Sequence, residues 1–296
     1  MTSIAMQRRR ATARRVWSQF RSSKQGMAGL IILIVFILLA VCAPLIVDVG
    51  ELNPVLARQA GNPQWAPPSE FPPLGTDHIR RSVWALFVWG SRVSLAVGLA
   101  ATILTVVIGA TIGIMAGFFG GKLDTLLSKF TEWFLVIPFL PLALVLASIL
   151  GRSIWNIIFV IGVTAWPWTA RLVRSQVLTV KQRLFVDRAR SLGASSSYLV
   201  SRHILPNISG LIVANATLAV PISILTETTL SFLGLGSPGA PSWGKTLEEA
   251  FVNGAITRAA WWYFVPAGLG ILAVVMAFTM IGRTLEEIAD PRLAGR

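Results

Sequence analysis

The chain has 296 residues, of which 54% are hydrophobic and 13% charged, and its formal net charge is +13. Soluble domains carry about 25% charged residues, so this composition excludes an ordinary soluble protein and indicates one that faces lipid. The positive charges flank the apolar stretches and form no single stripe, which argues against a nucleic-acid-binding protein.

Six apolar stretches are long enough to cross a bilayer, whose hydrocarbon core needs about 20 residues of helix. In chain order they are residues 28–47, 93–116, 132–150, 154–170, 208–233 and 262–283. Residues 151–153 alone separate the third stretch from the fourth, so these two are predicted to form a tight hairpin. Prolines such as Pro138 lie in or beside the spans, where they can kink a helix. The sequence predicts an all-α membrane protein with six transmembrane helices.

The remaining segments are tails and connections. Residues 1–27 form a basic tail, residues 48–92 an outer segment, and residues 285–296 a short C-terminal tail. The later five helices would build one transmembrane domain over residues 93–284, with long connections at 171–207 and 234–261.

The distribution of Lys and Arg predicts the orientation. With a cytoplasmic N-terminus, 19 of these residues fall on the inner side and seven on the outer side. Because positive charge accumulates on the cytoplasmic side of membrane proteins, both termini and the 171–207 connection are predicted to be cytoplasmic.

Three glycines follow one face of the second stretch. Gly109, Gly113 and Gly117 recur every four residues. Small residues at this spacing let two helix backbones approach closely. We expect this face to pack against another helix of the same chain, in preference to forming a dimer with a second copy.

The 171–207 connection contains a polar, arginine-rich cassette, residues 185–206 (FVDRARSLGASSSYLVSRHILP). Phe185, Ala189 and Leu192 recur at helical spacing and are predicted to form one short apolar face. Gly193 is expected to end this helix in a left-handed conformation. A serine after the glycine would cap a second helix, which is predicted to end at Pro206. A soluble partner could grip an element of this shape.

The cassette resembles the EAA loop of ABC-importer permease subunits, whose pattern is Glu-Ala-Ala, three residues, Gly, nine residues and Ile-x-Leu-Pro. The matching residues are Asp187, Arg188, Ala189, Gly193, Leu205 and Pro206. Two residues depart from the pattern: Arg188 replaces an alanine, and His203 stands at the isoleucine position.

The resemblance implies that the cassette is the coupling helix between the fourth and fifth spans, where ATPase motion enters the permease. Phe185, Ala189 and Leu192 would pack into the ATPase groove, and Gly193 would permit the turn. The polar rim and the remaining matched positions would be Asp187, Arg188, Arg190, Ala194, Leu205 and Pro206.

Glu227 is the one carboxylate well inside an apolar stretch, which makes it a functional candidate. It lies twenty residues beyond Asn207, and about 30 Å of helix separates the two at 1.5 Å per residue. We therefore expect Glu227 near the outer interface, capping or pairing there, and retain it as a candidate for the pathway or the outer gate.

Residues 239–246 (GAPSWGKT) fit the phosphate-loop string, but the context is wrong. A phosphate loop follows a strand and opens a helix, whereas this segment follows a membrane helix and lies on the predicted outer side. The two histidines of the chain, His78 and His203, lie on opposite predicted sides of the membrane, and the sequence shows no nucleophile–base set. We expect no nucleotide, metal or catalytic site in this chain.

A wider resemblance, over about residues 71–292, is to the C-type permease subunits of dipeptide and oligopeptide importers. The matching stretches are Leu74–Asp77, Gly90–Leu95, Gly117–Gly121, Leu123-Asp124, Ile137-Pro138, Trp166-Pro167, Ala170–Arg174, Ser231–Gly236, Pro241–Gly244 and Asp290–Arg292. That family continues Gly-Thr-Asp with Gly-Arg-Asp, where this chain has Arg80, Arg81 and Ser82.

This resemblance implies a heteromeric machine in the bacterial cytoplasmic membrane. The chain would pair with a B-type permease to enclose a pathway for peptides, two cytoplasmic ABC ATPases would bind below, and an extracytoplasmic peptide-binding protein would dock above. ATP and magnesium would be bound by the ATPases, so the chain itself would carry no cofactor and contact only protein and lipid.

Two alternatives remain. The same architecture also imports nickel complexes, glutathione or other small solutes, and nothing in the residues separates these cargoes. A secondary transporter that needs no ATPase would show ionisable residues at mid-membrane or inverted repeats, and neither is clear here.

Overall fold

The computed structural model describes residues 14–289, and within this range its regular secondary structure is helical, apart from one isolated bridge between Thr76 and Ser82. The start of the predicted basic tail (1–13) and residues 290–296, which include Asp290–Arg292, lie outside the described residues. The part of the basic tail that is described is helical over residues 14–22.

The longer helices are α2 (Lys24–Val41), α5 (Val83–Phe119), α6 (Gly121–Val136), α7 (Phe139–Leu150), α8 (Ile154–Lys181), α11 (Leu205–Leu230) and α13 (Trp261–Ala289). The shorter ones are α3 (Ala43–Ile46), α4 (Pro54–Gln59), α9 (Leu184–Ser191), α10 (Ser196–Leu199) and α12 (Trp243–Val252). A 3₁₀ turn, η1 (Val49–Leu52), and two π-helical turns, η2 (Val200–Ile204) and η3 (Ser231–Leu235), complete the described chain.

Five helices, or six if a bent pair counts as one span, are long and apolar enough to cross a membrane. The bent pair is α6 with α7, whose axes differ by 88°. The prediction of one continuous third helix over 132–150 is therefore wrong. Pro138 explains the break, because proline lacks a backbone N–H and forces the preceding residue out of the helical region; Ile137 accordingly has an extended ψ of 126°.

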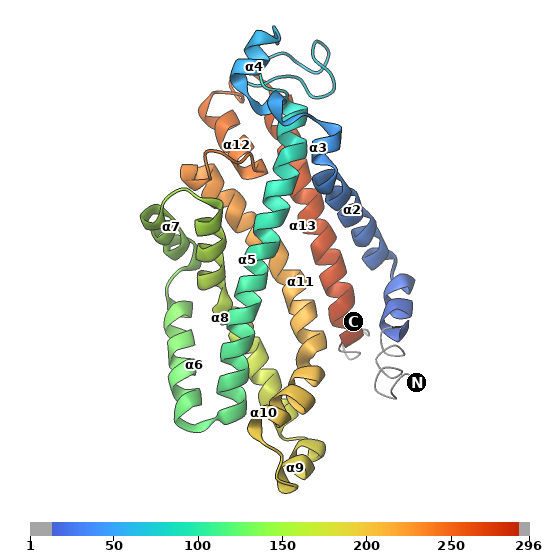
Figure 1. The fold of residues 1–296 in the computed structure, drawn as a ribbon, viewed down its shortest axis with the longest axis vertical. Coiled ribbons are helices and arrows are strands. Elements are labelled where there is room, and N and C mark those ends of the chain that lie inside the picture. Colours follow the sequence, from blue (N-terminus) through green and yellow to red (C-terminus); the bar gives the residue numbers. More distant parts are fainter. Residues whose placement is uncertain (1–13, 290–296) are drawn as a thin grey trace.

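Helix α5 begins ten residues before the apolar stretch that predicted it. Ser82 caps its N-terminus by accepting a hydrogen bond from the Ala85 amide at 3.3 Å. At 1.5 Å per residue, its 37 residues extend for about 55 Å, well beyond a hydrocarbon core of about 30 Å. Figure 1 shows α5 running almost the length of the bundle, from the cap around α4 toward the end that carries α9 and α10.

The glycine face of α5 packs against α8, as the sequence predicts. A Cβ on Gly109 would lie 2.7 Å from the Trp166 carbonyl oxygen, and one on Gly113 would lie 2.6 Å from the Ala170 carbonyl oxygen. Gly117 meets Val177 in the same way, at 2.8 Å. Because no side chain fits in these spaces, the three glycines set the distance between the two backbones.

The other large core joins α2, α11 and α13 to α5. Its buried members include Leu33 of α2, Ile224 of α11 and Val274 of α13. In Figure 1, α2 and α13 lie on one side of the bundle, and α6 and α7 lie on the opposite side. The bundle therefore has two different flanks and two different ends.

The second helix of the cassette does not end at Pro206, which corrects the sequence prediction. Helices α10, η2 and α11 continue into one another from Ser196 to Leu230, and η3 extends this segment as far as a kink at Gly234, whose φ is +83°. The Leu205 amide donates to the carbonyl of Val200, five residues back, so the chain makes a π-turn just before the proline. Pro206 follows this π-turn directly, and the wider turn accommodates a residue that has no N–H within the helical segment.

Candidate functional site

The cassette lies at one end of the bundle, beyond the ends of α5 and α8 (Figure 1). Gly193 adopts a left-handed φ of +82°, and its amide donates to the carbonyl of Arg190 at 2.9 Å. Ser195 caps α10 by accepting a hydrogen bond from the Tyr198 amide at 3.3 Å. The predicted helix–glycine–helix arrangement is confirmed, with the turn at the predicted residue.

The predicted apolar face of α9 is divided between inside and outside. Leu192 is 88% exposed and Leu184 is 74% exposed, while Phe185 also reaches solvent. Ala189, in contrast, packs inward beside the fully buried Val186. The regular spacing fails because α9 ends at Ser191, so Leu192 leaves the helical path.

Leu184 lies outside the cassette that the sequence predicts, which begins at the next residue. It lies at the first position of α9, and the signal that could have found it is the spacing of eight residues to Leu192. The surface that the cassette presents is therefore built from Leu184, Phe185 and Leu192, which we call the exposed apolar tip.

Polar residues surround this tip. Arg190 donates to Asp187 at 3.3 Å, and both side chains are about half exposed. Arg188 is exposed, as are Leu205 and Pro206 at the start of α11. An isolated ion pair of this kind in water contributes little to stability, so these charges are available to a partner.

His203, which departs from the family pattern, is half-buried between two aromatic rings. Its ring centroid is 6.0 Å from that of Phe185 and 5.7 Å from that of Tyr198. Ala194 also faces this side and packs on the inner core of the cassette. A shallow hollow follows the same surface, from Ala189 and Gly193 to His203.

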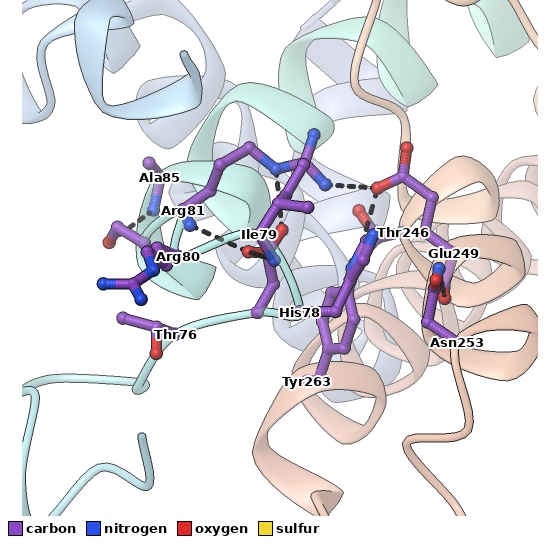
Figure 2. A network of polar contacts seen from close by, with 12 residues as sticks. Thr76, His78, Ile79, Arg80, Arg81, Ala85, Thr246, Glu249, Asn253 and Tyr263 are labelled. Carbon is purple, nitrogen blue, oxygen red and sulfur yellow. Dashed lines mark hydrogen bonds and ion pairs between the residues drawn. The ribbon is translucent and has the colours of Figure 1, made fainter. Parts of the chain in front are cut away.

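The opposite end of the bundle carries a buried network of charges (Figure 2). Asp77 is completely buried, and the Nε of Arg81 lies 2.6 Å from its Oδ2. The amides of Ile79 and Arg81 donate to its other oxygen at 2.9 and 2.8 Å. Arg81 also donates through Nη2 to Glu249 of α12, which lies 168 residues further along the chain.

This environment favours the charged form of Arg81. Burial opposes the charge, but the carboxylates of Asp77 and Glu249 outweigh burial and raise the pKa of Arg81 above its ordinary value. Burial lowers the pKa of His78, although the same two carboxylates oppose that shift. The cluster therefore holds a permanent cation between two carboxylates, beside a histidine that favours its neutral form.

Aromatic rings close this cluster from the side of α13. The hydroxyl of Tyr263 lies 3.3 Å from the Nδ1 of His78, and it donates to Glu249 at 3.4 Å. The ring of Trp65 packs on both His78 and Tyr263, and the guanidinium of Arg258 lies 5.3 Å above Trp65. Residues 62–82, α12 and the start of α13 thus form one unit. We call it the outer cap, because the distribution of Lys and Arg predicts that this end is extracytoplasmic.

The departures at residues 80–82 are explained by this geometry. Arg80 has a left-handed φ of +74°, a conformation that glycine, the family residue here, adopts without strain. The Arg80 guanidinium donates to the backbone carbonyl of Asn62 at 2.9 Å, and the side-chain amide of Asn62 donates to the backbone carbonyl of Arg80 at 3.2 Å. These two hydrogen bonds stabilise the strained turn. Ser82 replaces an aspartate and caps α5, a role that both residue types perform.

Glu227 is buried between three elements below the outer cap and is only 1% exposed. Ser231 donates to its Oε1 at 2.8 Å, and Ser94 of α5 donates to its Oε2 at 3.4 Å. Ser94 in turn accepts a hydrogen bond from the Trp243 amide, at the start of α12, at 3.1 Å. Hydroxyl groups, and no ion pair among the described residues, hold this carboxylate; its role in a pathway stays a prediction.

Stretches that are far apart in the sequence meet around Glu227. A Cβ on Gly90 would lie 2.9 Å from Trp243, and one on Gly244 would lie 2.7 Å from the Cα of Thr228. Lys245, which completes the false phosphate-loop string, pairs with Glu248 at 2.5 Å. The segment 241–246 is thus part of the packing of α12.

Two family models match the chain. The model for the inner membrane component of binding-protein-dependent transport systems matches residues 109–295, and the model for the N-terminal transmembrane domain of oligopeptide transport permease C matches residues 12–68. Together they cover most of the sequence.

Three curated proteins illustrate the similarity. An oligopeptide transport system permease protein of Bacillus subtilis is 36% identical over 93% of this chain and 88% of its own length. A dipeptide transport system permease protein of Alkalihalophilus pseudofirmus is 35% identical over 95% and 90%, respectively. A putative peptide transport system permease protein of Brucella suis is 34% identical over 90% and 87%.

Proposed function

This chain belongs to the family of inner membrane components of binding-protein-dependent transport systems, and we propose that its cassette is the element through which ATPase motion enters a peptide importer. The chain is a permease subunit of an ABC transporter for peptides, located in the bacterial cytoplasmic membrane. It carries no catalytic function of its own.

The exposed apolar tip carries this proposal. Burying a leucine side chain stabilises a complex by about 1.5–3 kcal/mol, and Leu184 and Leu192 leave most of this area in water. The tip projects from an end of the bundle, where a soluble partner can reach it, and Asp187, Arg188 and Arg190 surround it with charge. Such a surface suits a groove with an apolar floor and a polar rim.

Packing beneath the tip supplies a path for the motion. Val186 of α9 is fully buried in a cluster with Val177 of α8 and Ile208 of α11. A displacement of α9 would therefore move both helices, and α8 would carry α5 with it because the glycine face joins the two. This is a rigid-body transmission of the kind that alternating access requires.

Family membership supports our proposal for the remaining parts of the assembly. We propose a cytoplasmic position for the cassette and both termini, which the excess of Lys and Arg on that side supports. A B-type permease would share the pathway, and two ATPases would bind ATP and magnesium below it. A peptide-binding protein would dock on the outer cap.

A peptide cargo is favoured by the names of the relatives, which are oligopeptide and dipeptide permeases. Uptake of a labelled dipeptide into cells that express the whole transporter, with nickel and glutathione as competitors, tests this assignment. The assignment would be contradicted if nickel or glutathione reduced the uptake of the labelled dipeptide and an excess of unlabelled dipeptide did not reduce it.

A crosslinking experiment tests the cassette. Because Cys42 is the sole cysteine, Cys42→Ser gives a background in which Leu192→Cys can carry a benzophenone maleimide. We expect light to join this variant to a co-purifying ATPase subunit. Leu45→Cys is the matched control, since Leu45 is 87% exposed but lies near the opposite end, on α3.

A second experiment on the cassette measures peptide uptake. Leu192→Asp places a charge in the proposed apolar groove without changing the packing of the bundle, because the side chain is exposed. We expect peptide uptake to fall at least tenfold while the protein remains inserted and stable. Unchanged uptake, or adducts from Leu45→Cys instead of Leu192→Cys, would show that the ATPase binds elsewhere.

A further inference from the structure

The break between α6 and α7 exposes backbone that a regular helix would satisfy. The amide of Ile137, at the end of α6, has no hydrogen-bond partner within residues 14–289, and no side chain caps α7. The first bonded amide after the break is that of Leu142, which donates to Pro138 at 3.1 Å. Because Pro141 has no N–H, the unpaired donors are those of Ile137, Phe139 and Leu140.

The surroundings of the break are apolar and belong to the middle of the membrane. Phe134, just before it, packs on Trp166 of α8, with ring centroids 5.4 Å apart. Just after it, Ala143 and Ala147 of α7 pack with Ile161 of α8. At 1.5 Å per residue, Ile161 and Trp166 lie about 10–18 Å from the outer end of α8, which is the centre of a hydrocarbon core about 30 Å thick.

The break is held in this place by its own chain. At the inner end of α6, Arg174 of α8 makes two hydrogen bonds to Asp124, at 2.6 and 2.8 Å. At the other end, Gly151 turns the chain from α7 into α8 with a φ of +84°. The bend therefore lies between two fixed points.

The outer surface of the break is open in the isolated chain. Val136 is 81% exposed, and Ile137, Pro138 and Leu140 are also exposed. In hydrocarbon each unpaired backbone group costs several kcal/mol, and irregular backbone is tolerated only against protein or in a water-filled cavity. Lipid alone therefore does not suit this surface.

The opposite flank provides a contrast. Ile31, Val35 and Leu38 of α2 are also exposed and apolar, and they form one stripe along a helix whose interior amides are bonded. Nothing on that stripe requires a polar partner, so lipid is a sufficient neighbour.

We infer that the surface formed by Val136, Ile137, Pro138 and Leu140 is the contact surface for a second membrane-spanning chain, which supplies hydrogen-bond acceptors to the free amides of the break. The second membrane-spanning chain would be the partner permease, so the inference rests on the proposed function. Backbone carbonyls of an irregular segment, or hydroxyl and amide side chains, are the groups that fit. The stripe on α2 then faces lipid.

The test uses the cysteine-free background in membranes that contain the whole transporter. Val136→Cys and Ile137→Cys, each labelled with benzophenone maleimide, are compared with Leu38→Cys on α2. We expect light to join both break variants to one integral membrane chain other than this one and the ATPases. Leu38→Cys is expected to yield lipid adducts alone.

Three outcomes would overturn the inference. The break variants give lipid adducts alone; the Leu38→Cys variant captures the second membrane chain in their place; or a charged, membrane-impermeant maleimide labels the break variants in the assembled transporter, which would indicate a water-filled cavity. Two neighbouring positions are used so that poor expression of one variant leaves the other to decide.

The result also separates this inference from the proposed function. If Leu192→Cys captures an ATPase but the break variants capture no membrane chain, the importer assignment stands and the contact surface is wrong. If neither site captures a protein, the proposed function itself fails.

Discussion

The two ends of the bundle treat charge and apolar surface in opposite ways. At the outer cap, Asp77, Arg81 and Glu249 bond to one another and to backbone amides inside the protein. At the cassette, the pair Asp187 and Arg190 lies in water. One end thus satisfies its own polar groups, whereas the other leaves its surface for a partner to complete.

This difference between buried and exposed ion pairs indicates which interactions stabilise each end. Buried ion pairs cost desolvation energy on folding, but removing one partner leaves a charge without compensation. The outer cap is therefore specified by its own sequence and sensitive to single substitutions. The cassette depends on a few buried residues such as Val186, and its exposed residues are free to serve binding.

Arg81→Met should produce the largest effect. The substitution leaves Asp77 and Glu249 without their shared cation, and breaking a buried ion pair costs about 3–5 kcal/mol. We expect a loss of this size in the free energy of unfolding, measured by SDS titration of the purified chain in mixed micelles. Arg58→Met, an exposed arginine of the same end, is the control. Equal losses in both variants would contradict a closed network.

Gly193→Val should have an intermediate effect, located at the cassette. Nothing lies within 4 Å of an added Cβ, so the cost is backbone strain at φ +82°, about 1–3 kcal/mol. If that strain displaces the exposed apolar tip, peptide uptake should fall about tenfold, since 1.4 kcal/mol corresponds to a factor of ten. Gly193→Asn tolerates the left-handed region better and should retain more uptake. A valine variant with full uptake would mean that this turn has no role in coupling.

Arg190→Ala should change stability least. An exposed i,i+3 pair contributes about 0.2–0.5 kcal/mol, so the unfolding free energy should move by no more than this. The same SDS titration that measures Arg81→Met provides the comparison. A loss approaching that of Arg81→Met would remove the distinction between the two ends.

Much of the fold could be predicted from local patterns. The positions of the spans followed from hydropathy, and the packing of Gly109, Gly113 and Gly117 followed from their spacing, since a run of small residues on one helix face indicates close contact. The turn at Gly193 followed in the same way from a single residue type.

The errors arose where direction or distant contacts mattered. Hydropathy over 132–150 measures composition, and it cannot distinguish a straight helix from one that turns by 88° at Pro138. The face of α9 was misjudged because Leu192 lies beyond the last helical residue. The pairing of Arg81 with Glu249 leaves no local pattern, because the two residues are 168 positions apart.

The sequence by itself determined the class of protein, the family, the number of apolar stretches and the place of the cassette, because these properties reside in composition and short-range spacing. Only the tertiary structure decided which surfaces remain unsatisfied. The exposed apolar tip and the open break at Pro138 can be recognised only in the folded chain, because the partners of backbone and side-chain groups include residues far apart in the sequence.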